Sequence, residues 1–264
     1  MKYVLVTGAY GGMGKATVKA LKEAGYFVFA LDKTVPETTE ENVLPIQASV
    51  TDINDLQNAF EKVKKVTNEL FAIVHFAGYY MLDSLIEVDE NAYLNAFDVN
   101  CFGAYRINKV FFPLLTAGSR IIITTSELAP LAPLPFTGIY AITKSTLDKY
   151  AYSLRMEVQL KGIFVSVLRP GAVRTDMLGA STSALNKFTQ TTKLYDCNAT
   201  RFKKIVDSVE AKNVTTKKLA QKTLKIVNAK RPKQVYKLNR NPLLLLLNAL
   251  PQSFQTWIIK KILK

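Results

Sequence analysis

Two residues one helical turn apart, Tyr140 and Lys144, have the types and spacing of a proton-transfer pair. On a helix, residues four apart lie on the same face, so the phenol and the ammonium are neighbours. A free tyrosine has a pKa of about 10, and a nearby positive charge favours its phenolate. Lowering that pKa by roughly three units requires about 4 kcal/mol. The spacing therefore predicts that Tyr140 is a general acid/base whose pKa is lowered by Lys144.

The same spacing occurs again at Tyr105 and Lys109, so the elements around each pair have to distinguish them. Tyr140 begins a helix that follows an apolar strand and Ser126. Tyr105 lies inside the preceding long helix. We predict that Tyr105 is a packing or surface residue.

Apolar strands alternate with helices along most of the chain, which predicts a parallel sheet covered on both faces, an α/β fold. Strands are predicted over residues 2–7, 27–32, 44–48, 72–76, 120–125, 164–168 and 234–238. Helices are predicted from the glycines near residue 12 to 24, and over 53–70, 91–115, 138–160, 199–211 and 216–229. Residues 173–198 look polar and irregular. We predict one domain over 1–240, with 173–198 as a substrate loop and 241–264 as a tail.

Composition restricts the classes of protein that fit. A chain of 264 residues with 48% apolar and 21% charged residues suits one α/β domain, or at most two small ones. Two cysteines and one histidine argue against a disulfide framework or a zinc site, so we expect no metal and a reducing compartment. A strand at the N-terminus in place of a signal peptide, and no apolar run of ~18 residues, predict a cytoplasmic or peripheral membrane protein.

A glycine-rich loop joins the first strand to the first helix. Gly8, Gly12 and Gly14 let the backbone approach a pyrophosphate, and the helix N-terminus supplies free N–H groups. A P-loop is excluded because alanine stands at positions 9 and 16. A purely structural turn is the alternative.

Asp32 ends the second strand, where a carboxylate can accept hydrogen bonds from an adenosine ribose and repel a 2′-phosphate. This favours NAD over NADP, although Lys15 and Lys33 weaken the argument. A solvated strand end is the alternative reading of Asp32.

Together these residues resemble the short-chain dehydrogenase/reductase family over about residues 2–240. The resemblance implies a Rossmann-type doubly wound parallel sheet in three α/β/α layers. It implies that Asn100, Ser126, Tyr140 and Lys144 are the catalytic residues, with Lys144 also holding the nicotinamide ribose and Asn100 anchoring a water. The cofactor contacts it implies are Gly8, Tyr10, Gly12, Met13, Gly14, Asp32, Ser49, Val50, Ala77, Gly78, Asn100, Tyr140, Lys144, Pro170, Gly171, Val173 and Thr175.

The sequence departs from the family pattern at three places. His75 and Phe76 stand where the family usually has two asparagines, and we interpret His75 as a structural substitution. Ser49 precedes Val50 after the third strand, where the family often has an aspartate before an apolar residue, which could weaken the adenine contact. Ser126 precedes Tyr140 by 14 residues where 13 is commoner, which leaves Thr125 as the alternative hydroxyl.

The resemblance implies an NAD(P)-dependent oxidoreductase, with NAD preferred, that interconverts a secondary alcohol and a ketone. Apolar residues of the loop region suggest a steroid-, retinoid- or lipid-like substrate, although they could be ordinary packing residues: Met177, Leu178, Leu185, Phe188 and Leu194. A nucleotide-sugar epimerase or dehydratase, and a non-catalytic NAD-binding sensor or scaffold, are the alternatives. Members of the family commonly form dimers and tetramers by pairing the helices before and after the fifth strand. The resemblance therefore implies a homodimer or homotetramer.

The net charge of +14 lies entirely in residues 201–264, which hold 16 Lys or Arg against Asp207 and Glu210. Asn241 and Pro242 predict a helix start, and a leucine run follows over 243–247. Over 253–264, an apolar stripe of Phe254, Trp257, Ile258 and Ile262 is flanked by lysines. This tail could contact an anionic membrane peripherally, or pack on the domain or a partner subunit. Nucleic acid is not expected, since no binding module is visible.

Overall fold

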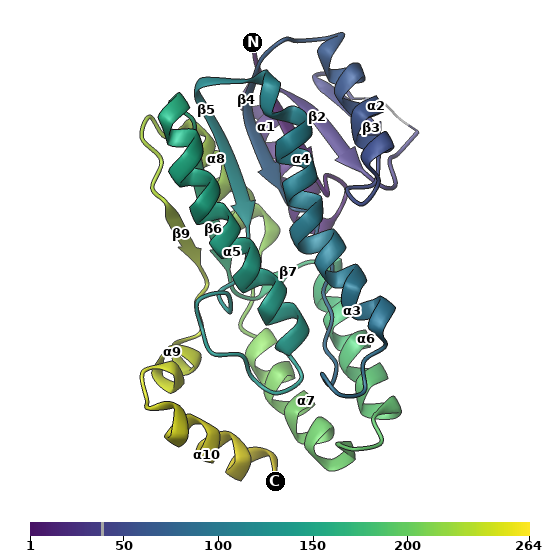
Figure 1. The fold of residues 1–264 in the computed structure, drawn as a ribbon, viewed down its shortest axis with the longest axis vertical. Helices are drawn as coiled ribbons and strands as arrows, with labels where there is room; N and C mark the ends of the chain where they lie inside the picture. Colours follow the sequence, from purple (N-terminus) through teal and green to yellow (C-terminus); the bar gives the residue numbers. More distant parts are fainter. Residues whose placement is uncertain (38–39) are drawn as a thin grey trace.

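In a computed structural model, the structure describes the backbone of residues 1–37 and 40–264, and the side chains of these residues outside 176–183 and 209–210. Seven strands form one parallel sheet in the order β3-β2-β1-β4-β5-β6-β9 (Figure 1). The strands are β1 (Lys2–Thr7), β2 (Tyr26–Asp32), β3 (Val43–Gln47), β4 (Leu70–His75), β5 (Leu115–Thr124), β6 (Phe164–Pro170) and β9 (Val235–Leu238). The chain starts in the middle, winds to one edge and then to the other. The predicted doubly wound α/β fold is confirmed.

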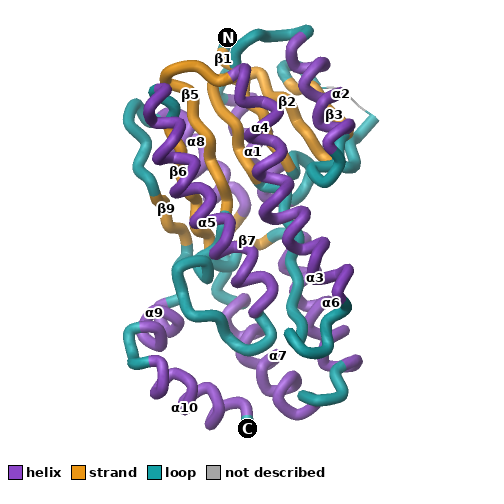
Figure 2. Tube along the Cα trace, in the orientation of Figure 1, coloured by secondary structure: helices purple, strands orange, loops and turns teal. Residues whose placement is uncertain are grey.

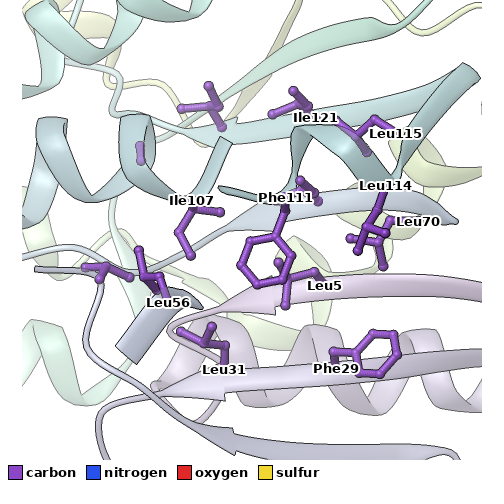
Figure 3. Packing of buried hydrophobic residues seen from close by; sticks show 14 of the residues in the cluster. Leu5, Phe29, Leu31, Leu56, Leu70, Ile107, Phe111, Leu114, Leu115 and Ile121 are labelled. Atoms are coloured by element: carbon purple, nitrogen blue, oxygen red, sulfur yellow. The ribbon is translucent and has the colours of Figure 1, made fainter. Parts of the chain in front are cut away.

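Successive residues of each central strand enter different cores, because side chains alternate across a sheet. Leu5 and Phe29 belong to one core and their neighbours Val4 and Val28 to the other. The first core is covered by α2 (Ile53–Lys64), α4 (Gly103–Phe111) and α5 (Gly138–Val158), and Figure 3 shows its packing around Phe111. The second is covered by α1 (Gly12–Glu23) and α8 (Thr216–Asn228). The sheet therefore lies between two helical layers.

The helix predicted over 91–115 is interrupted. It consists of α3 (Glu90–Phe97), a π-helical turn (Asp98–Phe102), α4 and a short 3₁₀ turn (Phe112–Leu114). Such π turns are rare and concentrate at functional sites. This one carries Asn100, whose side chain is held by groups outside its helix, as described below. Two other predicted boundaries differ, since α2 ends at Lys64 and β5 begins at Leu115.

The prediction of an irregular segment over 173–198 was wrong, because most of it is helical. After the short strand β7 (Val173–Arg174), the chain forms α6 (Asp176–Thr191) and α7 (Asp196–Glu210), and β8 (Val214–Thr215) pairs with β7. Leu185 and Phe188, three residues apart, are buried, and the ring of Phe188 lies 4.7 Å from that of Phe136. Tertiary packing of one helix face thus overrides a polar local sequence.

The tail forms two helices, α9 (Pro242–Asn248) and α10 (Gln252–Leu263). Asn241 is the predicted N-cap of α9, and its side chain accepts a hydrogen bond from the Leu243 N–H at 2.9 Å. Figure 2 shows both helices at the end of the molecule opposite the N-terminus. Among the described residues, no helix combines the length and the apolar character needed to cross a bilayer.

Candidate active site

The glycine loop is shaped by close backbone contacts at the carboxyl end of β1. Gly8 has a φ of 64°, which favours glycine, and a Cβ at Gly14 would lie 2.0 Å from the Gly8 carbonyl oxygen. The following first turn of α1 contains no acidic residue, and Gly11 gives it no side-chain cap. Its N–H groups and positive dipole end are therefore available to an anion, which fits the pyrophosphate of a dinucleotide.

Asp32 is connected to this loop. Its carboxylate accepts hydrogen bonds from the N–H groups of Tyr10 and Lys33, both at 2.8 Å. The two bonds fix the carboxylate beside the loop, where its charge would face an adenosine ribose. Beyond the next strand, Ser49 donates its N–H to Asp55 at 2.9 Å, and Val50 packs against Gly103.

Asn100 acts as a clamp between three elements. Its Oδ1 accepts the Tyr79 N–H at 2.7 Å, and its Nδ2 donates to the Tyr79 carbonyl at 2.8 Å and to the Thr143 hydroxyl at 3.0 Å. The side chain thus ties the π turn to the segment after β4 and to α5. This gives Asn100 a positioning role through its side-chain amide, whereas the resemblance implied that it anchors a water.

Tyr140 and Ser126 face each other across the end of β5. Tyr140 is half-buried, its ring lies 4.7 Å from that of Tyr80, and its hydroxyl forms a hydrogen bond with Ser126. The hydroxyl of Thr125 instead donates to Asp148 at 3.3 Å, and Asp148 pairs with Arg169. Ser126 therefore presents its hydroxyl to Tyr140, and Thr125 does not.

Lys144 is buried next to Tyr140. Its Nζ lies 5.7 Å from the centre of the Tyr140 ring and donates to the Thr124 carbonyl at 3.3 Å. Loss of hydration raises the pKa of Tyr140 to about 12 and lowers the pKa of Lys144 to about 8. The expectation that the ammonium lowers the pKa of Tyr140 is not met in the protein alone, where burial is the largest influence and raises that pKa. A group of pKa about 8 is nevertheless present, and it is Lys144.

One cavity brings together half of the predicted residues at the carboxyl ends of β1, β4, β5 and β6. The predicted residues that line it are Met13, Gly78, Ser126, Tyr140, Lys144, Pro170, Gly171, Val173 and Thr175. The other predicted residues do not line it. They are Gly8, Tyr10, Gly12 and Gly14 of the glycine loop, Asp32 beside that loop, Ser49 and Val50 beyond β3, Ala77 after β4, and Asn100 in the π turn. Gly78 is tightly placed, since a Cβ there would lie 3.3 Å from Asn100 Oδ1 and 3.5 Å from Lys144 Nζ.

The sequence analysis missed the apolar wall of this cavity. The wall includes Tyr80, Leu134, Phe202, Ile205, Val206 and Leu244. Of the loop residues singled out earlier, Leu185 and Phe188 are buried behind it, and Leu194 is 61% exposed. Met177 and Leu178 lie outside the described side chains. The helical spacing of Phe202, Ile205 and Val206 was the available signal.

Glu127 was also missed. It is buried, one oxygen accepts the Asn241 N–H at 2.6 Å, and burial raises the pKa of its carboxyl. A Cβ on Gly171 would lie 2.7 Å from its other oxygen. The residue after Ser126 therefore ties the active-site loop to the beginning of the tail. In the sequence, the only sign of this role was the position of a charged residue between Ser126 and an apolar loop.

Three other reactive side chains are structural. The His75 ring bonds Asn108 at 2.9 Å, and burial lowers its pKa to about 4, so it is a neutral core residue. Burial raises the pKa of the Cys101 thiol to about 11, which leaves no thiolate near neutral pH. Tyr105 is 45% exposed on α4. Among the described residues, no cluster of three metal-binding side chains occurs.

The family model described as short chain dehydrogenase matches residues 2–186. Estradiol 17-beta-dehydrogenase 2 of Mus musculus is 33% identical over 190 residues, which cover 68% of this chain and 50% of the mouse protein. The chain thus spans about half the length of that relative. The 3-ketodihydrosphingosine reductase of Bacteroides thetaiotaomicron is 24% identical, over 87% of this chain and 84% of its own length.

Solved structures support the fold. Aldohexose dehydrogenase of Thermoplasma acidophilum has a TM-score of 0.75 at 16% identity, covering 91% of this chain and 95% of its own. A short chain dehydrogenase of Burkholderia cenocepacia, solved in complex with NADP, has a TM-score of 0.73 at 17% identity, with both chains fully covered. At these identities the likeness concerns the fold alone.

Proposed function

Because the chain belongs to the short-chain dehydrogenase family, we propose that it is an NAD(P)-dependent oxidoreductase that interconverts a secondary alcohol and a ketone. The observation that carries this proposal is the placement of Ser126, Tyr140 and Lys144 around one cavity next to the glycine loop. The bound nicotinamide would accept or donate the hydride, and the protein has to position the substrate and move a proton.

The proton that is transferred in the reaction is shared by Tyr140 and Lys144, which act as a pair. Opposite charges on these two groups attract each other, since Lys144 Nζ lies 5.7 Å from the centre of the Tyr140 ring. Groups that are coupled in this way titrate together, so the first proton leaves the pair near the lower of the two pKa values, about 8. In alcohol oxidation, the pair takes the hydroxyl proton through the Tyr140 oxygen while hydride leaves the carbon. Ser126 donates a hydrogen bond to the substrate oxygen.

For the cofactor we propose NAD in preference to NADP. The support is Asp32, whose fixed carboxylate would accept from ribose hydroxyls and repel a 2′-phosphate. No other acid and no arginine adjoins it in the sequence, although Lys33 follows. Ser49, Val50, Ala77 and Gly78, at the ends of the neighbouring strands, are the proposed contacts of the adenine and its ribose.

For the substrate we propose an apolar, steroid-, retinoid- or lipid-like alcohol or ketone. The cavity beyond Tyr140 is walled by aromatic and aliphatic side chains from α7, the tail and the segments after β4 and β5. Mouse estradiol 17-beta-dehydrogenase 2 and the bacterial 3-ketodihydrosphingosine reductase carry names that denote such substrates. We propose that α6 and α7 close this side of the cavity.

We propose further that the enzyme is cytoplasmic and forms a homodimer or homotetramer through α4 and α5. These helices and the two short turns that flank α4 carry a set of exposed apolar residues that a second copy would cover: Phe102, Tyr105, Phe112, Tyr152 and Met156. Sedimentation of the wild type and of Tyr152→Ser tests this. An unchanged, monomeric mass for the wild type would contradict it.

The proposed activity is tested by following reduced nicotinamide in the presence of NAD or NADP and a panel of secondary alcohols, including steroids, retinoids and 3-hydroxy lipids. Turnover with NAD on an apolar alcohol supports the proposal. Tight NAD binding without turnover on any alcohol or ketone would favour the sensor alternative. Release of an isomerised nucleotide sugar without net cofactor reduction would favour the epimerase.

A further inference from the structure

The leucine run of the tail is only partly covered by the rest of the protein. Leu243 to Leu247 occupy most of α9, yet none of the residues of this helix is buried. Leu243 and Leu246 are 67% and 64% exposed. Of the five consecutive leucines, Leu243 and Leu246 are exposed and the other three are partly buried, so the exposed pair leaves an apolar surface that something else has to cover.

The second tail helix divides into two faces. Ile259 and Leu263 pack with Phe202 and Val206 of α7, and Gln255 on the same side is buried. The opposite side carries Phe254 and Trp257, both about half exposed, with their rings stacked at 5.5 Å, and Ile262 at the flank of the inward face is also about half exposed. The inward face anchors α10 to the protein. The outward aromatic face therefore stays exposed and cannot turn back onto the protein.

The charge of the tail indicates which kind of partner covers this surface. The tail has no acidic residue, and Lys260, Lys261 and Lys264 are exposed around the aromatic side, with Lys261 6.0 Å from the Trp257 ring. The wider region 201–264 has a net charge of +14. Two such surfaces repel each other, which argues against a second copy of this chain, and nucleic acid would leave the leucines unburied. An anionic bilayer accepts leucine and tryptophan at its interface while its headgroups attract the lysines.

We propose that the exposed faces of α9 and α10 are a docking surface for an anionic lipid bilayer. The surface is joined to the active site at two points. Glu127 accepts the Asn241 N–H at the start of α9, and Asn248 at its end accepts the Ala132 N–H at 2.7 Å. Between these points Leu244 lines the cavity. Docking thus holds one wall of the cavity at the lipid interface, and Figure 1 shows α9 and α10 below the carboxyl ends of the strands.

The test is flotation of the purified full chain with vesicles of neutral phosphatidylcholine, and with vesicles that also contain phosphatidylserine. The wild type is expected to float with the anionic vesicles only. The triple variant Leu243→Ser, Leu246→Ser, Trp257→Ser is expected to lose at least ~10-fold in vesicle affinity. Leu160→Ser is the matched control, because Leu160 is 82% exposed but lies at the far end of α5, and it should float like the wild type.

A charge variant gives an independent reading if the triple variant misfolds. Lys260→Glu with Lys261→Glu should abolish flotation, and Lys62→Glu with Lys65→Glu on the exposed face of α2 should not. Equal flotation of the wild type and the tail variants, or no flotation of the wild type, would overturn the proposal. So would vesicle-free sedimentation in which the wild type is a dimer and the triple variant a monomer, because the tail would then be a subunit interface. Neither readout depends on enzymatic activity.

Discussion

Replacing Lys144 by methionine should shift the rise of the alcohol-oxidation rate with pH from near pH 8 to near pH 12. In the wild type, the Tyr140–Lys144 pair loses its first proton near pH 8, where the pKa of Lys144 lies. In the variant only the phenol remains, and burial places its pKa at about 12. At pH 8 the phenolate fraction then falls to roughly 10⁻⁴, because four pKa units separate the two values.

We therefore expect kcat for oxidation at pH 8 to fall by about 10³- to 10⁴-fold in Lys144→Met and to rise roughly tenfold with each pH unit. The assay follows reduced nicotinamide at saturating NAD, so that weaker cofactor binding does not enter kcat. Lys144→Arg is the control. The arginine charge does not titrate, so any remaining rise of the oxidation rate with pH comes from Tyr140. If the oxidation rate of Lys144→Met still rises around pH 8, another group titrates there, and the reasoning about the pair would fail.

Three further predictions concern the cofactor, the core and the tail. Asp32→Ser should shift the ratio of NADP to NAD affinity by at least ~10-fold towards NADP, measured by fluorescence titration; an unchanged ratio would remove Asp32 from the selectivity argument. The pKa of His75 is lowered from 6.5 to about 4, so the folded state loses stability as the pH falls through that window, by up to about 3 kcal/mol. His75→Asn should abolish this dependence in urea titrations, and an acid sensitivity equal to that of the wild type would refute it. Glu127→Gln should lower the free energy of unfolding by about 1–3 kcal/mol and expose the 239–242 segment to protease, because the amide is a weaker acceptor for the Asn241 N–H; unchanged melting and cleavage would contradict the contact.

The fold was readable from the sequence because its signals are local. The local signals are apolar strands that are buried on both faces, the glycines after β1 and the helices that follow most of the strands. They specify the topology without knowledge of any distant contact. The motif positions follow from the same logic. The carboxyl ends of parallel strands meet at one edge, so residues after β1, β4, β5 and β6 had to lie together.

The parts that the sequence did not reveal depend on long-range packing. The helix α6 forms over a polar stretch because Leu185 joins an apolar cluster to which α7 and α10 contribute, and Phe188 packs on the ring of Phe136. The π turn at Asn100 is held by Tyr79 and Thr143, which lie 21 and 43 residues away in the chain. The pKa of Tyr140 was predicted with the wrong sign of shift, because the degree of burial of a pair one helical turn apart cannot be read from its spacing. Glu127 was overlooked for the same reason, since its partner Asn241 is 114 residues distant.

The central claim is that Tyr140 transfers the proton in an oxidoreductase built on this cavity. The most direct measurement compares wild-type protein and Tyr140→Phe for turnover and for NAD affinity. The phenylalanine keeps the ring contact with Tyr80 but removes the hydroxyl that faces Ser126. The account predicts loss of turnover by at least ~10³-fold with NAD affinity changed by less than about threefold. Turnover of the variant at the wild-type rate would contradict it.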